Sequence, residues 1–109
     1  MSPLGLLSPI VAAAVAFNVS GTWALNLIDR DGTHRQEYCT FTQDDARLNG
    51  TCGEQIRNGS AASGEVDGME VKWTVDGSTY TATLDQTRTF MRGRYTQNGG
   101  GVFTAMKTK

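Results

Sequence analysis

The sequence is poor in the residues on which most catalytic and metal sites depend. It contains one histidine, His34, and two cysteines in 109 residues. Structural and catalytic zinc sites use several His or Cys ligands, so no metal site is expected. The chain also lacks a Gly-rich phosphate loop, a serine nucleophile motif and a second histidine to act as a base. We therefore expect no enzyme activity and no cofactor.

An excess of positive charge is missing as well. Lys and Arg number 10 against 11 Asp and Glu, which gives a formal net charge of −1. Nucleic acid and anionic membrane surfaces are therefore not expected as partners. Proline is scarce, at 2, whereas glycine reaches 13. That ratio favours a curved sheet with tight turns over a disordered linker.

Long hydrophobic stretches are absent except at residues 1–16, which are apolar and end in an Ala-Val-Ala triplet. This pattern resembles the apolar region and cleavage site of a secretory signal, although no positive charge precedes it. The segment is too short to span a bilayer comfortably, so we expect no stable membrane span. The alternative is a short apolar helix that docks on the domain or mediates assembly. We expect a domain at residues 17–109 and a secreted or periplasmic location.

Period-two alternation is clearest from Met69 to Leu84, around the pair Asp76-Gly77. Asp and Gly tolerate the positive φ of a type I′ turn, so this pattern predicts a β-hairpin with Trp73 opposite Tyr80. The same reasoning at Asp67-Gly68 predicts Val66 opposite Met69 and Gly64 opposite Val71. Strands are expected near 19–28, 34–43, 48–53, 61–66, 69–75 and 78–84, with one more after 85–89 and a last after 98–100.

Eight short strands joined by tight turns form an up-and-down meander. Inward-facing glycines at Gly50, Gly64 and Gly93 fall where a sheet must bend sharply. An open meander would leave two bare edges and an exposed apolar face, and pairing the first strand with the last removes both. We therefore predict an all-β fold, an eight-stranded antiparallel up-and-down β-barrel. A two-sheet sandwich is the alternative, because alternation alone does not report closure.

The two cysteines fall on neighbouring predicted strands. Pairing Gln43 with Leu48 across the intervening turn places Cys39 opposite Cys52. Opposed strand residues have Cβ atoms about 4.5–5.5 Å apart, and a disulfide needs roughly 3.5–4.5 Å. A cross-strand disulfide is thus feasible, and with the signal-like start it indicates an oxidising compartment. Two buried free thiols are the alternative.

Three short motifs resemble those of the calycin barrels, the lipocalins, fatty-acid-binding proteins and avidins. They are Ser20-Gly21-Thr22-Trp23, Leu48-Asn49-Gly50-Thr51 and Phe103-Thr104-Ala105-Met106-Lys107. The chain looks most similar to small bacterial lipocalin-like or avidin-like domains. The resemblance implies that Trp23 on the first strand is covered by Lys107 from the last, as a cation–π pair that closes one barrel end. The several tryptophans of an avidin biotin site are reduced to Trp23 and Trp73, so biotin binding is not implied.

The aromatic residues are the best candidates for a binding site. Trp73, Tyr80 and Tyr95 fall in one register row, and Phe41 and Phe103 share their inward face. These side chains either fill the core or line a pocket. Topology places the loops 30–33, 54–60, 76–77 and 97–100 at one end, opposite Trp23, so a ligand would enter there.

The leading functional prediction is an exported protein that holds a small hydrophobic or aromatic ligand in the open end of the barrel. A protein-binding module with a filled core, similar to small barrel protease inhibitors that use an N-terminal wedge, is the second. An assembly or surface protein, with the apolar N-terminus packed between copies as a homo-oligomer, is the third.

Overall fold

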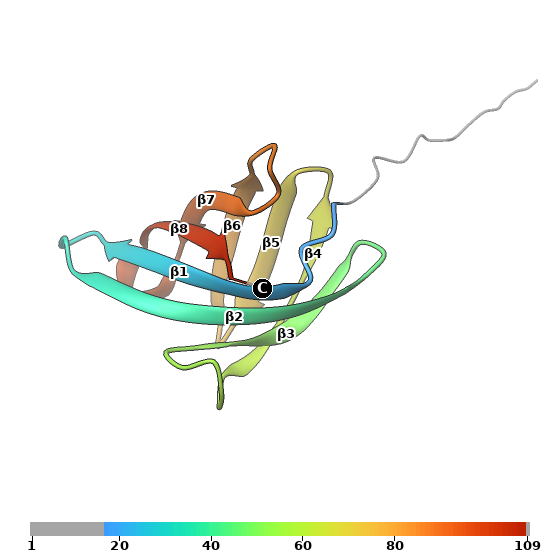
Figure 1. Cartoon of the computed structure of the whole chain (residues 1–109). Helices are drawn as coiled ribbons and strands as arrows, with labels where there is room; N and C mark the ends of the chain where they lie inside the picture. The colour runs from blue at the N-terminus through green and yellow to red at the C-terminus, as the bar shows by residue number, and fades with distance from the viewer. Residues whose placement is uncertain (1–16, 109) are drawn as a thin grey trace, which may run out of the picture.

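The computed structural model describes residues 17–108, so the predicted signal-like segment and its helical alternative lie outside the described residues. Within this range the chain consists of β-strands in sequence order, joined by short turns (Figure 1). The strands are β1 (Gly21–Asp29), β2 (His34–Asp44), β3 (Arg47–Gly53), β4 (Ser60–Asp67), β5 (Glu70–Val75), β6 (Ser78–Leu84), β7 (Phe90–Tyr95) and β8 (Gly101–Lys107), with a short 3-10 helix, η2 (Gln97–Gly99), before the last.

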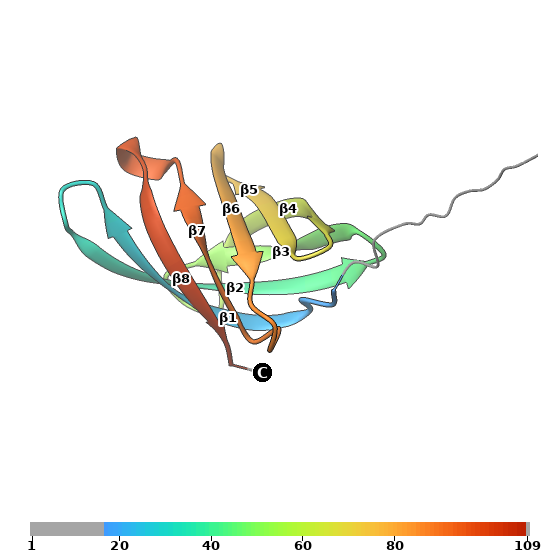
Figure 2. The same cartoon turned by 90° about the horizontal axis from the view of Figure 1, so that it is seen from above.

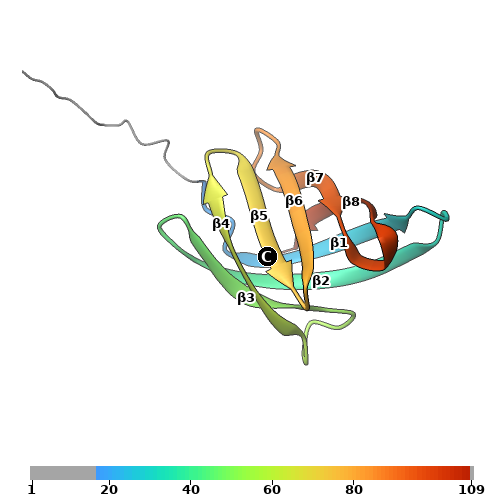
Figure 3. The ribbon, with the colours of Figure 1, turned by 180° about the vertical axis from the view of Figure 1, so that it is seen from behind.

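The strands close into an antiparallel barrel in the order β1 to β8. The decisive contact is between the first and last strands, which pair from Trp23 opposite Lys107 to Asp29 opposite Gly101. Seen from above, β8 lies beside β1 on one side and β7 on the other (Figure 2). From behind, β4, β5 and β6 cross in front of β1 and β2 (Figure 3). The predicted eight-stranded barrel is confirmed, and the sandwich alternative is not formed.

Most of the predicted strand registers are confirmed. Trp73 lies opposite Tyr80, and Cys39 lies opposite Cys52. The β4–β5 register was predicted wrongly, because Val66 pairs with Val71 and not with Met69. The loop consists of Gly68 and Met69, with Gly68 at φ +61°. The first loop position has a left-handed conformation, which favours Gly, so Gly68 occupies the first loop position and not the second. The turn is therefore one residue closer to the C-terminus than predicted, and the β4–β5 pairing is shifted by two residues.

Three inward-facing glycines allow neighbouring strands to approach closely at bends. A Cβ atom on Gly50 would overlap the carbonyl oxygen of Thr40, and one on Gly93 would overlap that of Thr81. Gly64 has the same relation to the carbonyl oxygen of Lys72. These positions therefore require residues without side chains, as expected for a small, strongly curved barrel.

One end of the barrel is closed by the chain that precedes β1. Val19 is fully buried, and its carbonyl accepts a hydrogen bond of 3.0 Å from the indole N–H of Trp23. The backbone N–H of Val19 donates to the side-chain oxygen of Gln43 on β2. Phe17 packs against the core, and the guanidinium of Arg88 lies 4.2 Å above its ring centroid. This end is the sealed end.

The predicted stacking of Lys107 on Trp23 is not found. Lys107 lies opposite Trp23 in the β1–β8 ladder, but the cation–π contacts among residues 17–108 involve Arg35, Arg88 and Arg92. Trp23 is instead covered by the segment before β1, to which its indole N–H donates. Arg88 on Phe17 supplies the basic side chain at this end.

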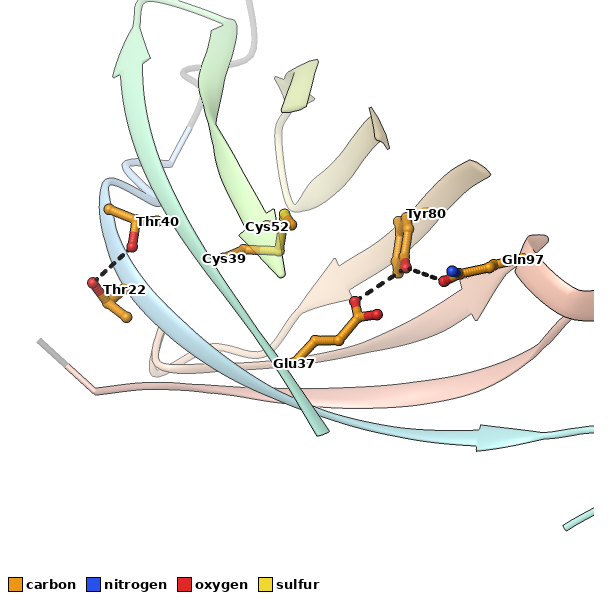
Figure 4. The surroundings of a disulfide bond; sticks show 7 residues. All are labelled: Thr22, Glu37, Cys39, Thr40, Cys52, Tyr80 and Gln97. Carbon is orange, nitrogen blue, oxygen red and sulfur yellow. Dashed lines mark hydrogen bonds between the residues drawn. A yellow bond between two sulfur atoms is a disulfide. The ribbon is translucent and has the colours of Figure 1, made fainter. Parts of the chain in front are cut away.

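The predicted disulfide is present. Cys39 of β2 and Cys52 of β3 are bonded, with their Cα atoms 4.1 Å apart (Figure 4). Both side chains are buried and belong to the core. A disulfide is compatible with an oxidising compartment. Across residues 17–108 we find no helix with the length and apolar character needed to cross a bilayer.

Candidate functional site

The five aromatic residues predicted to line a binding site form one packed cluster inside the barrel. The ring centroids of Trp73 and Tyr80 lie 5.2 Å apart with planes 7° from parallel, and those of Tyr80 and Tyr95 lie 5.7 Å apart. Phe41 and Phe103 meet the Trp73 ring edge-on, at 5.1 and 5.7 Å. All five are almost fully buried. At this level the barrel is filled, as in the core interpretation of these residues.

Space remains above this cluster, at the end where the β1–β2, β3–β4, β5–β6 and β7–β8 loops lie. A cavity of about 190 Å³ is present there. Of the five predicted aromatic residues, Tyr80 alone lines it. Cys52 and Val75 add apolar surface, but most of the other lining side chains are polar or charged: Arg35, Glu37, Glu54, Ser60, Asp76 and Gln97. We refer to this cavity as the mouth.

The floor of the mouth is a buried hydrogen-bonded group from two strands and the short 3-10 helix η2. Glu37 of β2 is only 8% exposed, and its Oε1 lies 3.2 Å from the hydroxyl of Tyr80 on β6. The same hydroxyl lies 3.1 Å from Oε1 of Gln97 in η2 (Figure 4). A phenol has one hydrogen to donate, so it can satisfy only one of these oxygens at a time. The other oxygen is left free to accept a hydrogen bond from a ligand.

Arg35 connects this floor to the end of β1. Its guanidinium donates to both oxygens of Asp29, at 3.1 and 3.3 Å, and to Oε2 of Glu37 at 3.3 Å. The hydroxyl of Tyr95 donates a short hydrogen bond to Asp29, and the guanidinium lies 5.7 Å from the Tyr95 ring centroid. Arg35 is therefore fixed between two carboxylates and against an aromatic ring.

These contacts shift the ionisation of the groups involved. The Arg35 guanidinium, helped by the Tyr95 hydroxyl, holds the pKa of Asp29 below its usual range. Hydrogen bonding to Asp29 raises the pKa of Arg35. Burial raises the pKa of Tyr80, and the Glu37 carboxylate beside it acts in the same direction. Burial and the bond to Asp29 likewise raise the pKa of Tyr95. Both phenols thus remain neutral hydrogen-bond donors across the physiological range.

The electrostatic character of the mouth is acidic. Glu37, Glu54 and Asp76 line it together with one guanidinium, that of Arg35. Because Arg35 is shared by two carboxylates, those of Asp29 and Glu37, its charge is not free for an anionic ligand. Within residues 17–108, no group of three His, Cys, Asp or Glu side chains is arranged to hold a metal ion.

The charged floor of this site, Glu37 with Arg35 and Asp29, was not predicted from the sequence, although a signal for it existed. The predicted inward residues of β2 begin at Cys39 and end at Gln43. When the same alternation is extended toward the N-terminus, the next inward residues are Glu37 and Arg35. On β1 the alternation through Leu25 and Leu27 reaches Asp29. Gln97 carries no such signal, because the 3-10 helix that places it interrupts the strand pattern.

The indole N–H of Trp73 is another polar group at the centre of the barrel. It is buried and has no hydrogen-bond partner. The nearest rings are those of Phe41, Tyr80 and Phe103. A buried donor without a conventional acceptor is rare in folded proteins.

Comparison with known proteins supports the architecture. The sequence matches no protein-family model and no curated protein. A solved structure of a redesigned β-barrel is similar to this chain, with a TM-score of 0.59 and 20% sequence identity over 84% of this chain and 91% of that one. At this identity the likeness shows the fold alone. The chain is an eight-stranded antiparallel β-barrel, and a calycin relationship remains a resemblance of short motifs.

Proposed function

We propose that this chain is an exported binding protein, secreted or periplasmic, that holds a compact ligand in the mouth of a calycin-like barrel. The observation that carries the proposal is the mouth itself, a cavity with a buried, hydrogen-bonded polar floor. Burying a carboxylate is costly unless it is paired. A barrel that needed only stability could place apolar residues at Glu37 and Tyr80. A polar floor under a cavity is therefore typical of a binding site.

The size of the mouth limits the ligand. Pockets for drug-sized molecules usually enclose about 300–1,000 Å³, whereas the mouth encloses about 190 Å³. It suits a molecule of roughly one aromatic ring with a short substituent. Because the aromatic cluster below is closely packed, such a ligand would lie above Tyr80 and not between the rings.

The chemistry of the mouth favours a ligand with N–H donors or a positive charge. The surplus of carboxylates attracts a cation, and whichever of the Glu37 and Gln97 oxygens does not receive the Tyr80 hydrogen can accept a hydrogen bond from it. A compact aromatic amine meets both conditions. The sequence predicts a small hydrophobic or aromatic ligand, and the mouth restricts this class to ligands that carry a hydrogen-bond donor. Binding without chemical conversion is part of the proposal.

A titration with benzylamine tests the proposal, with benzoate as the probe of matched size and opposite charge. Amide shifts of the mouth residues, followed by NMR, are expected to change saturably with benzylamine and much less with benzoate. Glu37→Gln keeps the shape of the floor and removes its charge, and should weaken benzylamine binding about tenfold or more, as for a charged hydrogen bond. Asp44→Asn is the matched control, because Asp44 lies exposed on β2 at the opposite end of the strand.

Either of two results would contradict the proposal. One is the absence of saturable shifts in the mouth with benzylamine. The other is equal binding by wild type and Glu37→Gln, which would show that the floor carboxylate does not contact the ligand.

A further inference from the structure

The outer surface of the barrel differs sharply between its two sides. On β7, β8, β1 and the adjoining half of β2, every second residue points outward. Each of these four strands contributes three such residues, and each residue lies beside its ladder partners on the neighbouring strands. We name this set the apolar–basic face. It consists of Phe90, Arg92 and Arg94; Val102, Thr104 and Met106; Ala24, Asn26 and Ile28; and His34, Gln36 and Tyr38.

The apolar–basic face is enriched in exposed apolar side chains. Ile28 is 38% exposed, Val102 51% and Met106 58%. Ile28 and Val102 are direct cross-strand partners, so they form one continuous patch. Ile56, the remaining large apolar residue that is strongly exposed among residues 17–108, lies in the β3–β4 loop. Contiguous apolar surface on a small domain usually marks a contact site.

The charges on this face have one sign. Arg92 and Arg94 are exposed, and the set contains no Asp or Glu. The outward residues of β3 to β6 form the opposite side, where Arg47 and Lys72 alternate with Glu65 and Glu70 and hydroxyl residues fill most other positions. Although the net charge of the whole chain is near zero, this face therefore carries a local positive surface beside its apolar patch.

A groove of about 730 Å³ crosses this face. Ile28, Val102 and Phe103 contribute its apolar lining, while Arg92, Arg94 and His34 border it. Gly93, at the bend of β7, also lines it. The groove is larger than the mouth and lies on the outside of the barrel wall, so the two sites are independent.

We propose that the apolar–basic face binds an acidic segment of a partner protein, with an apolar side chain of that segment between Ile28 and Val102 and its carboxylates on Arg92 and Arg94. Charge complementarity selects this occupant, because the face offers cations without a carboxylate of its own. A second copy joined through the same face would bring two arginine-bearing surfaces together with no carboxylate on either to pair them.

The size of the face also favours a segment over a globular surface. Four strands spaced about 4.8 Å apart give a width of roughly 15 Å. A stable globular interface buries about 800 Å² on each partner, which is more than a patch of this width and similar length supplies. An extended segment with one apolar anchor and flanking acids fits the dimensions.

Binding of a designed peptide tests the proposal with the full chain. The probe is a short fluorescein-labelled peptide with a central Leu-Phe pair flanked by Glu on both sides. Its controls are the same peptide with Lys in place of Glu, and with Ser in place of Leu-Phe. Wild type is expected to bind the first peptide, less tightly as salt increases, and the controls at least about tenfold more weakly.

Two variants locate the contact. Arg92→Glu combined with Arg94→Glu, and separately Val102→Ser, should each reduce affinity for the acidic peptide about tenfold or more. Lys72→Glu is the matched control on β5 and should bind like wild type. Circular dichroism verifies the fold of each variant, and all substituted positions are exposed.

Several outcomes would overturn the proposal. They are equal binding of the acidic and lysine peptides, loss of binding in Lys72→Glu but not in the arginine variant, and unchanged binding in both variants of the face. Binding to phosphatidylglycerol vesicles without binding to the acidic peptide would instead assign the face to a lipid surface. Self-association abolished by Val102→Ser, again without peptide binding, would assign it to a second copy.

Discussion

Arg35 is the residue on which the structure of the mouth depends. It lies between Asp29 and Glu37, and Tyr95 packs beside it. Removing one partner of such a group leaves the others imperfectly paired, so the effects of substitutions here should not be additive. The same arrangement orients Glu37 toward Tyr80 and holds the floor in one conformation.

Asp29→Asn is predicted to destabilise the protein in a pH-dependent way. The folded state lowers the pKa of Asp29 below its ordinary value of 3.8, so the ionised form contributes stability above that pH. This contribution is lost as the pH falls through the folded-state pKa. The difference in urea midpoint between wild type and Asp29→Asn should therefore be largest near neutral pH and shrink toward strongly acidic pH.

Asp31→Asn provides the comparison for that series. The pKa of Asp31 is also lowered, chiefly by the backbone N–H of Thr33, but Asp31 is exposed and does not touch Arg35. Its substitution should leave the mouth intact. A destabilisation by Asp29→Asn that grows on acidification would contradict the assigned role of the ion pair.

Gly93→Ala is predicted to be costly for a steric reason. The added Cβ would overlap the carbonyl oxygen of Thr81, which is backbone and cannot move aside cheaply. We expect a loss of about 3 kcal/mol, at the upper end of overpacking costs. Gly99→Ala is the control: its φ of +84° disfavours Ala, but nothing lies within 4 Å of the new atom. That change should cost about 1 kcal/mol. Equal losses in urea unfolding would contradict the close approach.

At the scale of strands and hairpins, turn chemistry predicted most pairings. Asp76 and Gly77 both have positive φ, and the hairpin they connect has the predicted register. The same Asp-Gly pattern failed at Asp67-Gly68, because Asp67 remains in β4 and pairs with Glu70. A dipeptide indicates that a turn is near, whereas the left-handed conformation of Gly68 places this residue first in the loop.

The disulfide is predicted to stabilise the β2–β3 hairpin and with it the barrel. It joins residues 13 apart in sequence, and closing a loop of similar size is worth about 3 kcal/mol. Cys39→Ala combined with Cys52→Ala should lose about that free energy of unfolding in urea. Reductant should destabilise wild type and leave the double variant unchanged. A double variant as stable as wild type would show that strand pairing alone suffices.

For the whole molecule, closure could be predicted from the sequence, but the details of both ends could not. Alternation and the cost of bare edges predict that β1 meets β8, and Leu25 pairs with Ala105 as a result. The seal over Trp23 depends on a non-strand segment ending at Val19, which has no periodic pattern. At the mouth, the contacts of Arg35 join residues from different strands, and only the folded geometry defines them.

A closed barrel is predicted to unfold as one unit. Each strand pairs with two neighbours, so no strand can leave without breaking two ladders. Trp23 reports on the sealed end and Trp73 on the core, so the variants Trp73→Phe and Trp23→Phe each retain one fluorescent reporter. In each variant, tryptophan fluorescence and circular dichroism should give the same urea midpoint. Non-coincident transitions within one variant would reveal a part that melts separately.

These two substitutions should differ in cost. The Trp73 N–H has no partner, so Trp73→Phe sacrifices no hydrogen bond. Trp23→Phe removes the bond to Val19, which is worth about 1 kcal/mol. Both substitutions also remove packing volume, which costs free energy in each variant. The informative measurement is therefore the difference between the unfolding free energies of the two variants.

The chain enters and leaves the barrel at the same pole. Val19 covers Trp23, and the backbone N–H of Thr108 donates to the carbonyl of Thr22 at that same pole. The mouth lies at the opposite pole, where strand ends and the loops that join them line it. A tether fused to either side of residues 17–108 would therefore attach to the base, and the cavity would face outward from an immobilising surface. This geometry suits the domain to display on beads or on a carrier protein without obstruction of its opening.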